Sequence, residues 1–275
     1  MNRHPSLSIL SKPFVVMGIL NVTPDSFYDG GRYRELDAAC AQAQKLIEEG
    51  ADIIDIGGES TRPGSQQVSA EQEIERVIPV IKEIRKKSEI IISIDTTKSQ
   101  VAKAALDAGA NWINDISAGR FSPHMPSLAA KRACPVILMH SRKQPADMQV
   151  EPYYDNVLTE VRDELLQSID NFIGQGVKKE NILIDPGIGF AKRYEDNIAL
   201  LNNLDTLSKL GYPVLIGTSR KSFLAKITGR GADERLAATL ASIGIAYRRK
   251  AKVFRVHDVK ETVDYLKVLT AAENG

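Results

Sequence analysis

Cysteine, long apolar runs and an excess of charge of one sign are all scarce in this sequence, and each shortage excludes a class of protein. Among the 275 residues there are two cysteines, Cys40 and Cys134, and they form no CxxC pair, so neither a disulfide framework nor a Cys/His zinc site is expected. No apolar run approaches the roughly 20 residues that a membrane-spanning helix needs. The formal net charge of +1 offers no general attraction for nucleic acid or an anionic membrane surface.

Nucleotide-binding motifs and a secretion signal are also absent from the sequence. Neither GxxxxGK[ST] nor GxGxxG occurs. The N-terminal segment MNRHPSLSIL lacks the apolar core of a signal peptide. With its cysteines interpreted as reduced structural thiols, the chain is expected to be cytoplasmic, with no nucleic-acid or membrane partner.

What the sequence does contain is a regular alternation of apolar runs and amphipathic stretches. Gly50 is expected to end a helix, and capping patterns at Ser69–Gln72 and Thr97–Gln100 predict two helix starts. The strands are too apolar to be half-exposed, which indicates a parallel sheet covered by helices. Eight strand-then-helix units predict a single-domain α/β fold over residues 1–275, a closed (β/α)8 TIM barrel. The predicted strands are FVVMGIL, ADIIDIG, IIISI, NWIND, PVILMH, NILID, PVLIG and KVFRV.

Polar residues follow the predicted strands, where a barrel places its active site. Helix capping explains a few of them, but not a set of cations beside carboxylates and amides. Arg62, Lys221, Arg255 and His257 are four potential cations that could hold a di- or polyanion. Asp95, Asn114 and Asp185 are expected to project inward from three strands, and their donors and acceptors suit a polar heteroaromatic ring. Asn21 could hold Mg²⁺ that substrate phosphates and water mostly bind.

Seven segments in chain order together resemble the dihydropteroate synthase family. They are NVTPDSF (21–27), GGESTRPG (57–64), SIDT (93–96), NDISAG (114–119), DPGIGF (185–190), SRKSFL (219–224) and RVHDV (255–259). The resemblance covers essentially the whole chain. It implies a TIM barrel that condenses 6-hydroxymethyl-7,8-dihydropterin pyrophosphate with p-aminobenzoate, giving 7,8-dihydropteroate and pyrophosphate in folate synthesis. It further implies a Mg²⁺ requirement, inhibition by sulfonamides and a homodimer.

The resemblance also implies a role for individual residues of this chain. The pterin pyrophosphate would be bound by Thr61, Asp95, Asn114, Asp185, Lys221, Arg255 and His257, of which Asp95, Lys221, Arg255 and His257 would act in catalysis. The p-aminobenzoate site would be formed by Thr61, Arg62, Pro63, Phe190, Lys221 and Ser222. Asp25 and Phe27 would belong to a lid, and Asn21 would contact the metal.

The sequence departs from the family pattern in places and leaves other functions open. MHSRKQPADMQ adds Arg142 and Lys143 near the expected mouth, Ala191 follows Phe190 where glycine is common, and Tyr28 stands where serine is common. A pterin-dependent methyltransferase with a corrinoid partner would share the barrel and the ring contacts. A paralogue that binds pterin without turnover is the non-enzyme alternative. A pyrophosphate-release assay with both substrates separates the three.

Overall fold

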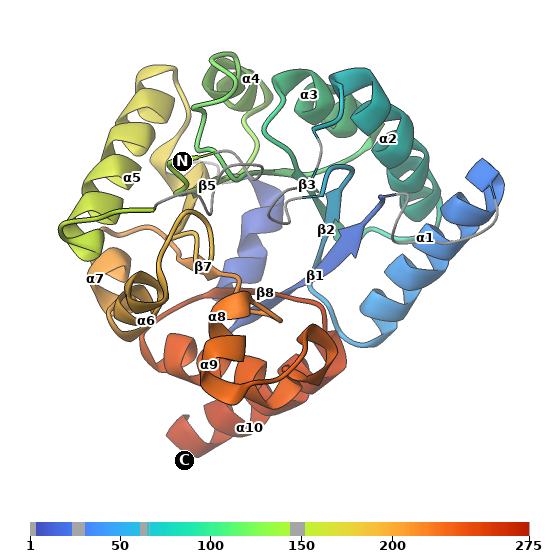
Figure 1. Cartoon of the computed structure of the whole chain (residues 1–275). Helices are drawn as coiled ribbons and strands as arrows, with labels where there is room; N and C mark the ends of the chain where they lie inside the picture. Colours follow the sequence, from blue (N-terminus) through green and yellow to red (C-terminus); the bar gives the residue numbers. More distant parts are fainter. Residues whose placement is uncertain (1–3, 24–30, 61–64, 66, 144–151, 275) are drawn as a thin grey trace.

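The computed structural model describes residues 4–23, 31–60, 65, 67–143 and 152–274, and its strands form one parallel sheet curved into a barrel (Figure 1). The eight strands in these ranges pair in the order β6-β5-β4-β3-β2-β1-β8-β7. A parallel bridge between Ile184 and Val214 joins the two ends of this order and closes the ring. The strands are β1 (Val15–Asn21), β2 (Ile53–Gly57), β3 (Ile91–Asp95), β4 (Trp112–Asp115), β5 (Val136–Met139), β6 (Ile182–Asp185), β7 (Leu215–Ile216) and β8 (Val253–Val256).

Helices form the outer ring around the strands, as the predicted (β/α)8 barrel requires (Figure 1). Within the described ranges, none of them is long and apolar enough to cross a membrane. The α-helices are α1 (Gly31–Glu48), α2 (Ala70–Lys87), α3 (Ser99–Ala108), α4 (Met125–Arg132), α5 (Val157–Gly174), α6 (Tyr194–Asn202), α7 (Leu204–Ser208), α8 (Ser222–Thr228), α9 (Leu236–Arg248) and α10 (Val259–Asn274). The 3-10 helices are η1 (Pro5–Ser11), η3 (Lys179–Asn181) and η4 (Ala232–Glu234).

One of the two predicted helix caps is confirmed and the other is wrong. The Ser69 side chain accepts from the backbone N–H of Gln72, and the Gln72 side chain accepts from the Ser69 N–H, so α2 begins with a capping box. At α3 the N-cap is Lys98, not Thr97. The hydroxyl of Thr96 accepts the Lys98 N–H at 3.1 Å and thereby holds a turn before the helix starts.

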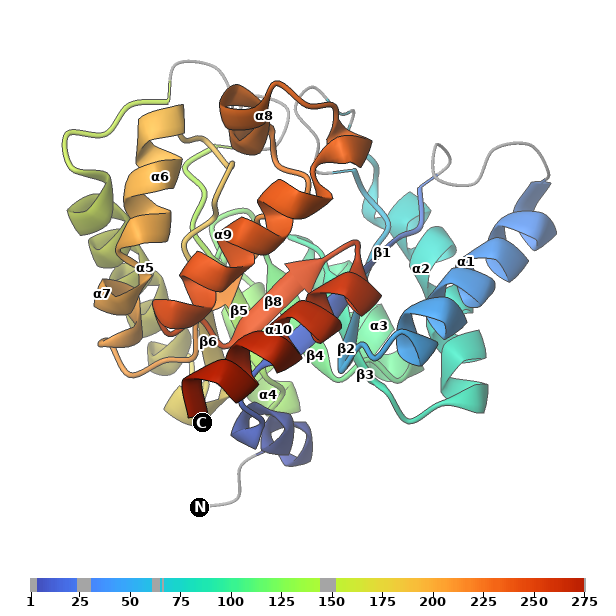
Figure 2. The ribbon, with the colours of Figure 1, turned by 90° about the horizontal axis from the view of Figure 1, so that it is seen from below.

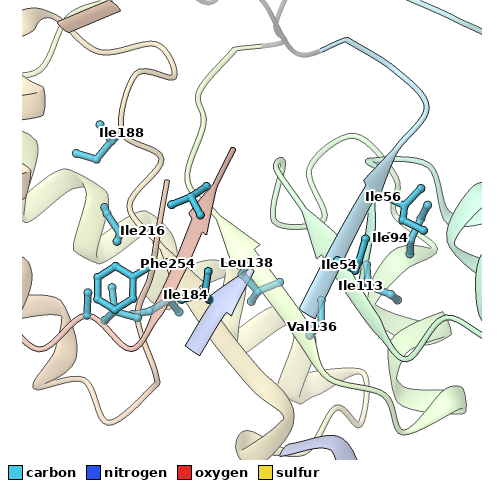
Figure 3. Close-up of a cluster of buried hydrophobic side chains, with 14 of the residues drawn as sticks. Ile54, Ile56, Ile94, Ile113, Val136, Leu138, Ile184, Ile188, Ile216 and Phe254 are labelled. Carbon is cyan, nitrogen blue, oxygen red and sulfur yellow. The ribbon is translucent and has the colours of Figure 1, made fainter. Parts of the chain in front are cut away.

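Side chains alternate along each strand between the barrel interior and the helix layer. Outward side chains such as Ile54, Ile94 and Leu138 pack in the large cluster between strands and helices (Figure 3). A second apolar cluster fills the barrel interior near the starts of the strands, here called the lower half of the barrel, and Leu7 of η1 belongs to it. The indole of Trp112 donates to the Ser6 hydroxyl at 2.6 Å, which fixes η1 at this end. Figure 2 shows η1 at the N-terminus and α8 at the opposite end, to which the strand arrows point.

The period of two places polar groups directly above this apolar interior. Ile53 belongs to the interior cluster, so Asp55 two residues further along β2 faces inward as well. In the same way Trp112 is followed by Asn114, Leu183 by Asp185 and Val253 by Arg255. The lower half of the barrel is therefore an apolar core, and its upper half is a polar chamber. The lower half is filled by Val15, Met17, Ile53, Trp112, Ile137, Leu183, Leu215 and Val253.

Candidate active site

An arginine forms the centre of the polar chamber. The Arg255 Nε donates to Asp55 Oδ2 at 2.6 Å, and one of its terminal nitrogens donates to Asp95 Oδ2 at 2.7 Å. Asp55 also accepts from the Asn114 amide at 3.0 Å. Residues of β2, β3, β4 and β8 are thus joined in one network around a single guanidinium.

Burial and the arginine act in opposite directions on the network's carboxylates. Burial raises the pKa of Asp95, and the Arg255 guanidinium works against that rise. For Arg255 itself, burial lowers the pKa, but the Asp55 and Asp95 carboxylates outweigh it, so the pKa stays above its ordinary value. The guanidinium is therefore charged and lies between two buried carboxylates.

Asp185 lies on the other side of the chamber, near Lys221. Its Oδ1 accepts the Gly187 N–H at 2.7 Å, and burial raises its pKa to about 6. Burial and the Arg255 charge lower the pKa of Lys221 to about 8, while Asp185 and Asp95 oppose this. The Lys221 Nζ lies 4.0 Å from the centre of the Phe190 ring, in a cation–π contact. At neutral pH an ionised carboxylate and an ammonium group can therefore face the same ligand.

His257 follows β8, and its surroundings oppose its protonation when no ligand is bound. Burial, Arg255 and Arg220 lower its pKa to about 4. Its Nδ1 lies 3.0 Å from the Ser219 hydroxyl, which also accepts the His257 backbone N–H at 3.2 Å. A bound anion would favour the protonated ring again. Lys221 is the N-cap of α8, and Ser222 is the first residue of that helix.

Asn21, which was expected to contact a metal, offers one oxygen ligand. Asn21 ends β1 and is partly exposed. Among the described residues, no three His, Cys, Asp or Glu side chains gather in a way that could hold a metal ion. An amide oxygen is chemically suited to Mg²⁺, but a single one cannot replace its hydration shell. The donor set therefore fits a metal that arrives with, and is largely held by, a phosphate-bearing ligand.

Several predicted site residues lie outside the described ranges. They are Asp25 and Phe27 of the first loop and Thr61, Arg62 and Pro63 of the second, together with Tyr28. Of the sequence departures, Arg142 is turned to α5 instead of the chamber: its guanidinium donates to Glu160 at 2.6 Å and to Glu164 at 2.5 Å.

Asp55 was not among the predicted site residues, yet it is fully buried and accepts hydrogen bonds from both Arg255 and Asn114. A signal for it was present. Asp55 is a charged residue in the middle of the apolar run IIDIG, and a buried strand tolerates a charge only if a partner faces it. The identity of that partner, two hundred positions away in the chain, could not be read from the run itself.

Comparisons with known proteins agree with this geometry. Residues 17–257 match the family model described as pterin binding enzyme. A dihydropteroate synthase of Bacillus subtilis is 45% identical over 274 residues, covering 100% of this chain and 94% of the relative. A Xanthomonas albilineans dihydropteroate synthase solved with 4-aminobenzoic acid has a TM-score of 0.90 at 45% identity and covers 96% of this chain and 94% of its own. A dihydropteroate synthase from Yersinia pestis, solved as a sulfonamide drug complex, has a TM-score of 0.91 at 41% identity. The match covers 97% of this chain and 96% of the Yersinia pestis chain. With its full length matched at this identity, the chain belongs to the pterin-binding enzyme family and, within it, to the dihydropteroate synthases.

Proposed function

We propose that the polar chamber binds the pterin pyrophosphate and that the dihydropteroate synthase reaction takes place at its mouth. The observation that carries this proposal is the convergence of Asp95, Asn114 and Asp185 with the cations Lys221 and Arg255 above the apolar barrel core. Carboxylates and an amide bind the edge of a pterin, and cations bind the pyrophosphate.

The Asp185 carboxylate would accept two N–H groups from the amino-pyrimidinone edge of the ring. Its second oxygen is available for this purpose because Gly187 occupies only Oδ1. Asn114 and Lys221 would donate to ring oxygen or nitrogen atoms, and Asp95 would lie beside the ring. A flat apolar ring has no matching polar edge and would leave these buried polar groups of the site unpaired. The site therefore favours a pterin over such a ring.

Arg255 and His257 would hold the pyrophosphate. A guanidinium has five N–H donors, of which Asp55 and Asp95 take two within the described residues, so three remain for phosphate oxygens. Asn21 would contact Mg²⁺ that the pyrophosphate binds, and the ion would supply further neutralisation of the leaving group. The Asp55 carboxylate keeps the guanidinium at this place while the substrate enters and leaves.

The chemistry then consists of a bond cleavage and a bond formation at one methylene. The C–O bond breaks, and pyrophosphate leaves with the electron pair. The positive charge that develops on the methylene spreads into the dihydropterin ring, where the Asp95 carboxylate favours it. The neutral amine of p-aminobenzoate forms the new C–N bond and loses a proton to water. Because the arylamine is already neutral at pH 7, positioning contributes more than a strong base would.

The p-aminobenzoate would lie beside Phe190, Lys221 and Ser222. Thr61, Arg62 and Pro63, which would complete this half of the site, are outside the described ranges. Sulfonamides would compete for this half of the site, as the drug complex of the Yersinia pestis relative supports. A homodimer is also part of the proposal, by analogy with the family. The free thiols Cys40 and Cys134 support a cytoplasmic location.

Pyrophosphate release tests the proposed function. The purified protein should release pyrophosphate only when the pterin pyrophosphate, p-aminobenzoate and Mg²⁺ are all present. Asp185→Asn should lose pterin binding in calorimetry while its melting temperature stays near that of the parent. Release of pyrophosphate that does not depend on p-aminobenzoate, or normal pterin binding by Asp185→Asn, would contradict the proposal.

A further inference from the structure

A second buried polar cluster lies beside the chamber and is formed by the side chains of Lys192, His140 and Glu164. The backbone N–H of His140 donates to the Asp185 carbonyl at 2.9 Å, so the cluster adjoins the end of β6. The centre of the cluster is Lys192, which is 3% exposed. The Lys192 Nζ lies 3.0 Å from the Phe190 carbonyl, 3.0 Å from the His140 Nδ1 and 3.3 Å from the His140 carbonyl. Burial of a lysine this deep is costly unless each ammonium proton has an acceptor, and here three acceptors are present.

The position of the hydrogen on the His140 ring follows from its contact with Glu164. Glu164 on α5 accepts from Arg120 and Arg142, and these hydrogen bonds help to hold its pKa below the ordinary range despite burial. The His140 Nε2 lies 3.1 Å from the Glu164 Oε2, so it carries the hydrogen. Burial lowers the pKa of His140 to about 3, so the ring is neutral and its Nδ1 has a free electron pair.

The Nδ1 of this tautomer needs a donor, and Lys192 supplies it. Burial lowers the pKa of Lys192 to about 7, while the carboxylates of Asp185, Glu164 and Asp196 raise it. The three acceptors around Nζ are satisfied together only by the ammonium form. Lys192, His140 and Glu164 therefore form one directed chain of hydrogen bonds, here named the Lys192 relay, from the loop after β6 to α5.

The Lys192 relay holds the backbone of that loop from behind. The Phe190 carbonyl is bound by Lys192, and the Ala191 carbonyl is bound by the Tyr154 hydroxyl at 3.0 Å. Gly187, at φ +69°, is pressed so closely onto His140 that a Cβ there would lie 2.0 Å from the His140 carbonyl oxygen. The relay thus holds the backbone of the loop, and the Phe190 side chain of this loop packs against Lys221.

We propose that Lys192 is a positioning residue for the p-aminobenzoate half of the site. By binding the Phe190 carbonyl, it sets the place of the Phe190 ring against the Lys221 ammonium, 4.0 Å away, without touching the substrate itself. The proposal rests on the proposed function, in which Phe190 and Lys221 border p-aminobenzoate. Asp95 and Asn114 are on other strands. Asp185 begins the same loop, but its side chain is held by the Gly187 N–H and is reached by Lys192 only through charge, so the pterin half should depend on the relay less than the p-aminobenzoate half.

The test is a comparison of the two KM values in Lys192→Met, which keeps the length of the side chain and removes its donors. The KM for p-aminobenzoate should rise, by at most the roughly 10- to 100-fold that corresponds to one charge-assisted hydrogen bond. The KM for the pterin pyrophosphate should rise less, because Lys192 acts on Asp185 only through its charge. An unchanged KM for p-aminobenzoate, or an equal rise of both KM values, would overturn the proposal.

A matched control separates positioning from general loss of stability. Asn181 is also buried and its amide donates to the Ala133 carbonyl at 2.9 Å, but it precedes β6 at the opposite end of the barrel. Asn181→Ala should lower the melting temperature and leave both KM values unchanged. A selective rise in the KM for p-aminobenzoate in this control would overturn the proposal as well.

Two further variants keep the test decisive. If Lys192→Met does not fold, His140→Gln interrupts the relay at its centre and should show the same selective rise, and its absence would overturn the proposal. Phe190→Leu examines the proposed function separately. If Phe190→Leu and Lys192→Met both leave the KM for p-aminobenzoate unchanged in an active enzyme, the assignment of Phe190 fails with the relay; if only Lys192→Met leaves it unchanged, the relay alone fails.

Discussion

Replacing Asp55 by asparagine removes one negative charge from the Arg255 network and changes the side-chain volume very little. In the parent protein the guanidinium is shared between Asp55 at 2.6 Å and Asp95 at 2.7 Å. With Asp55 neutral, Asp95 becomes the only full charge in contact with Arg255 in this network. We expect the guanidinium to shift toward Asp95, away from the pyrophosphate and closer to the place of the pterin ring.

The size of the effect can be estimated from the bond that changes. A hydrogen bond to a charged group contributes about 1.5–3 kcal/mol. The Arg255 and Asn114 donors share Asp55 Oδ2, and an asparagine carbonyl oxygen in that place can still accept both, so the variant loses the charge of the acceptor and not the acceptor itself. A loss of about 1.5–3 kcal/mol corresponds to roughly a 10- to 100-fold lower kcat/KM for the pterin pyrophosphate. The free energy of unfolding should change less, because Asp55 Oδ1 is buried without a partner among the described residues and its charge is costly there.

The assay is pyrophosphate release with one substrate varied at a time, together with thermal unfolding. Asp52→Asn is the matched control, since Asp52 stands just before β2 at the other end of the barrel, where it accepts the Val16 N–H at 2.8 Å. This control should keep its kcat/KM. If Asp55→Asn retains kcat/KM within about twofold of the parent, or if Asp52→Asn loses as much, Asp55 does not position Arg255.

Three other changes should have measurable results. Because pterin binding needs ionised Asp185, whose pKa is about 6, the affinity for a pterin measured by calorimetry should fall as pH drops below 6, close to tenfold per unit, and an affinity that stays constant below pH 6 would contradict this role. Mg²⁺ should bind the apoprotein weakly and bind well only with pyrophosphate, and Asn21→Ala should weaken the ternary complex; tight Mg²⁺ binding without phosphate would contradict the assignment. Ala191 has φ 46°, so Ala191→Gly should relieve strain that offsets its lost methyl and change the free energy of unfolding by less than about 1 kcal/mol, whereas Ala105→Gly in the right-handed helix α3 should cost more in chemical denaturation.

The barrel and the chamber residues were predictable because the relevant signals are local. Eight apolar runs separated by helical patterns require a covered parallel sheet, and the polar residue after each run must then lie at the same end of the sheet. Asp95, Asn114, Asp185, Lys221 and Arg255 were expected at this end, and the structure places them there. The start of α3 was predicted wrongly because two adjacent threonines offer equivalent hydroxyls, and only the folded turn selects Thr96.

The sequence by itself determined which side chains face the interior, since the alternation along a strand depends on nothing outside the strand. Only the tertiary structure decided how their charges are paired. Arg255 is held by Asp55 and Asp95 because the curvature of the barrel brings the end of β8 within reach of β2 and β3. The pKa of Lys192 is set by its burial and by the Asp185, Glu164 and Asp196 carboxylates that the fold places around it. The pKa of His257 is lowered in the same way, by burial and by the neighbouring cations Arg255 and Arg220. Pairing and protonation depend on distances of a few ångströms between residues far apart in the chain, and folding alone sets those distances.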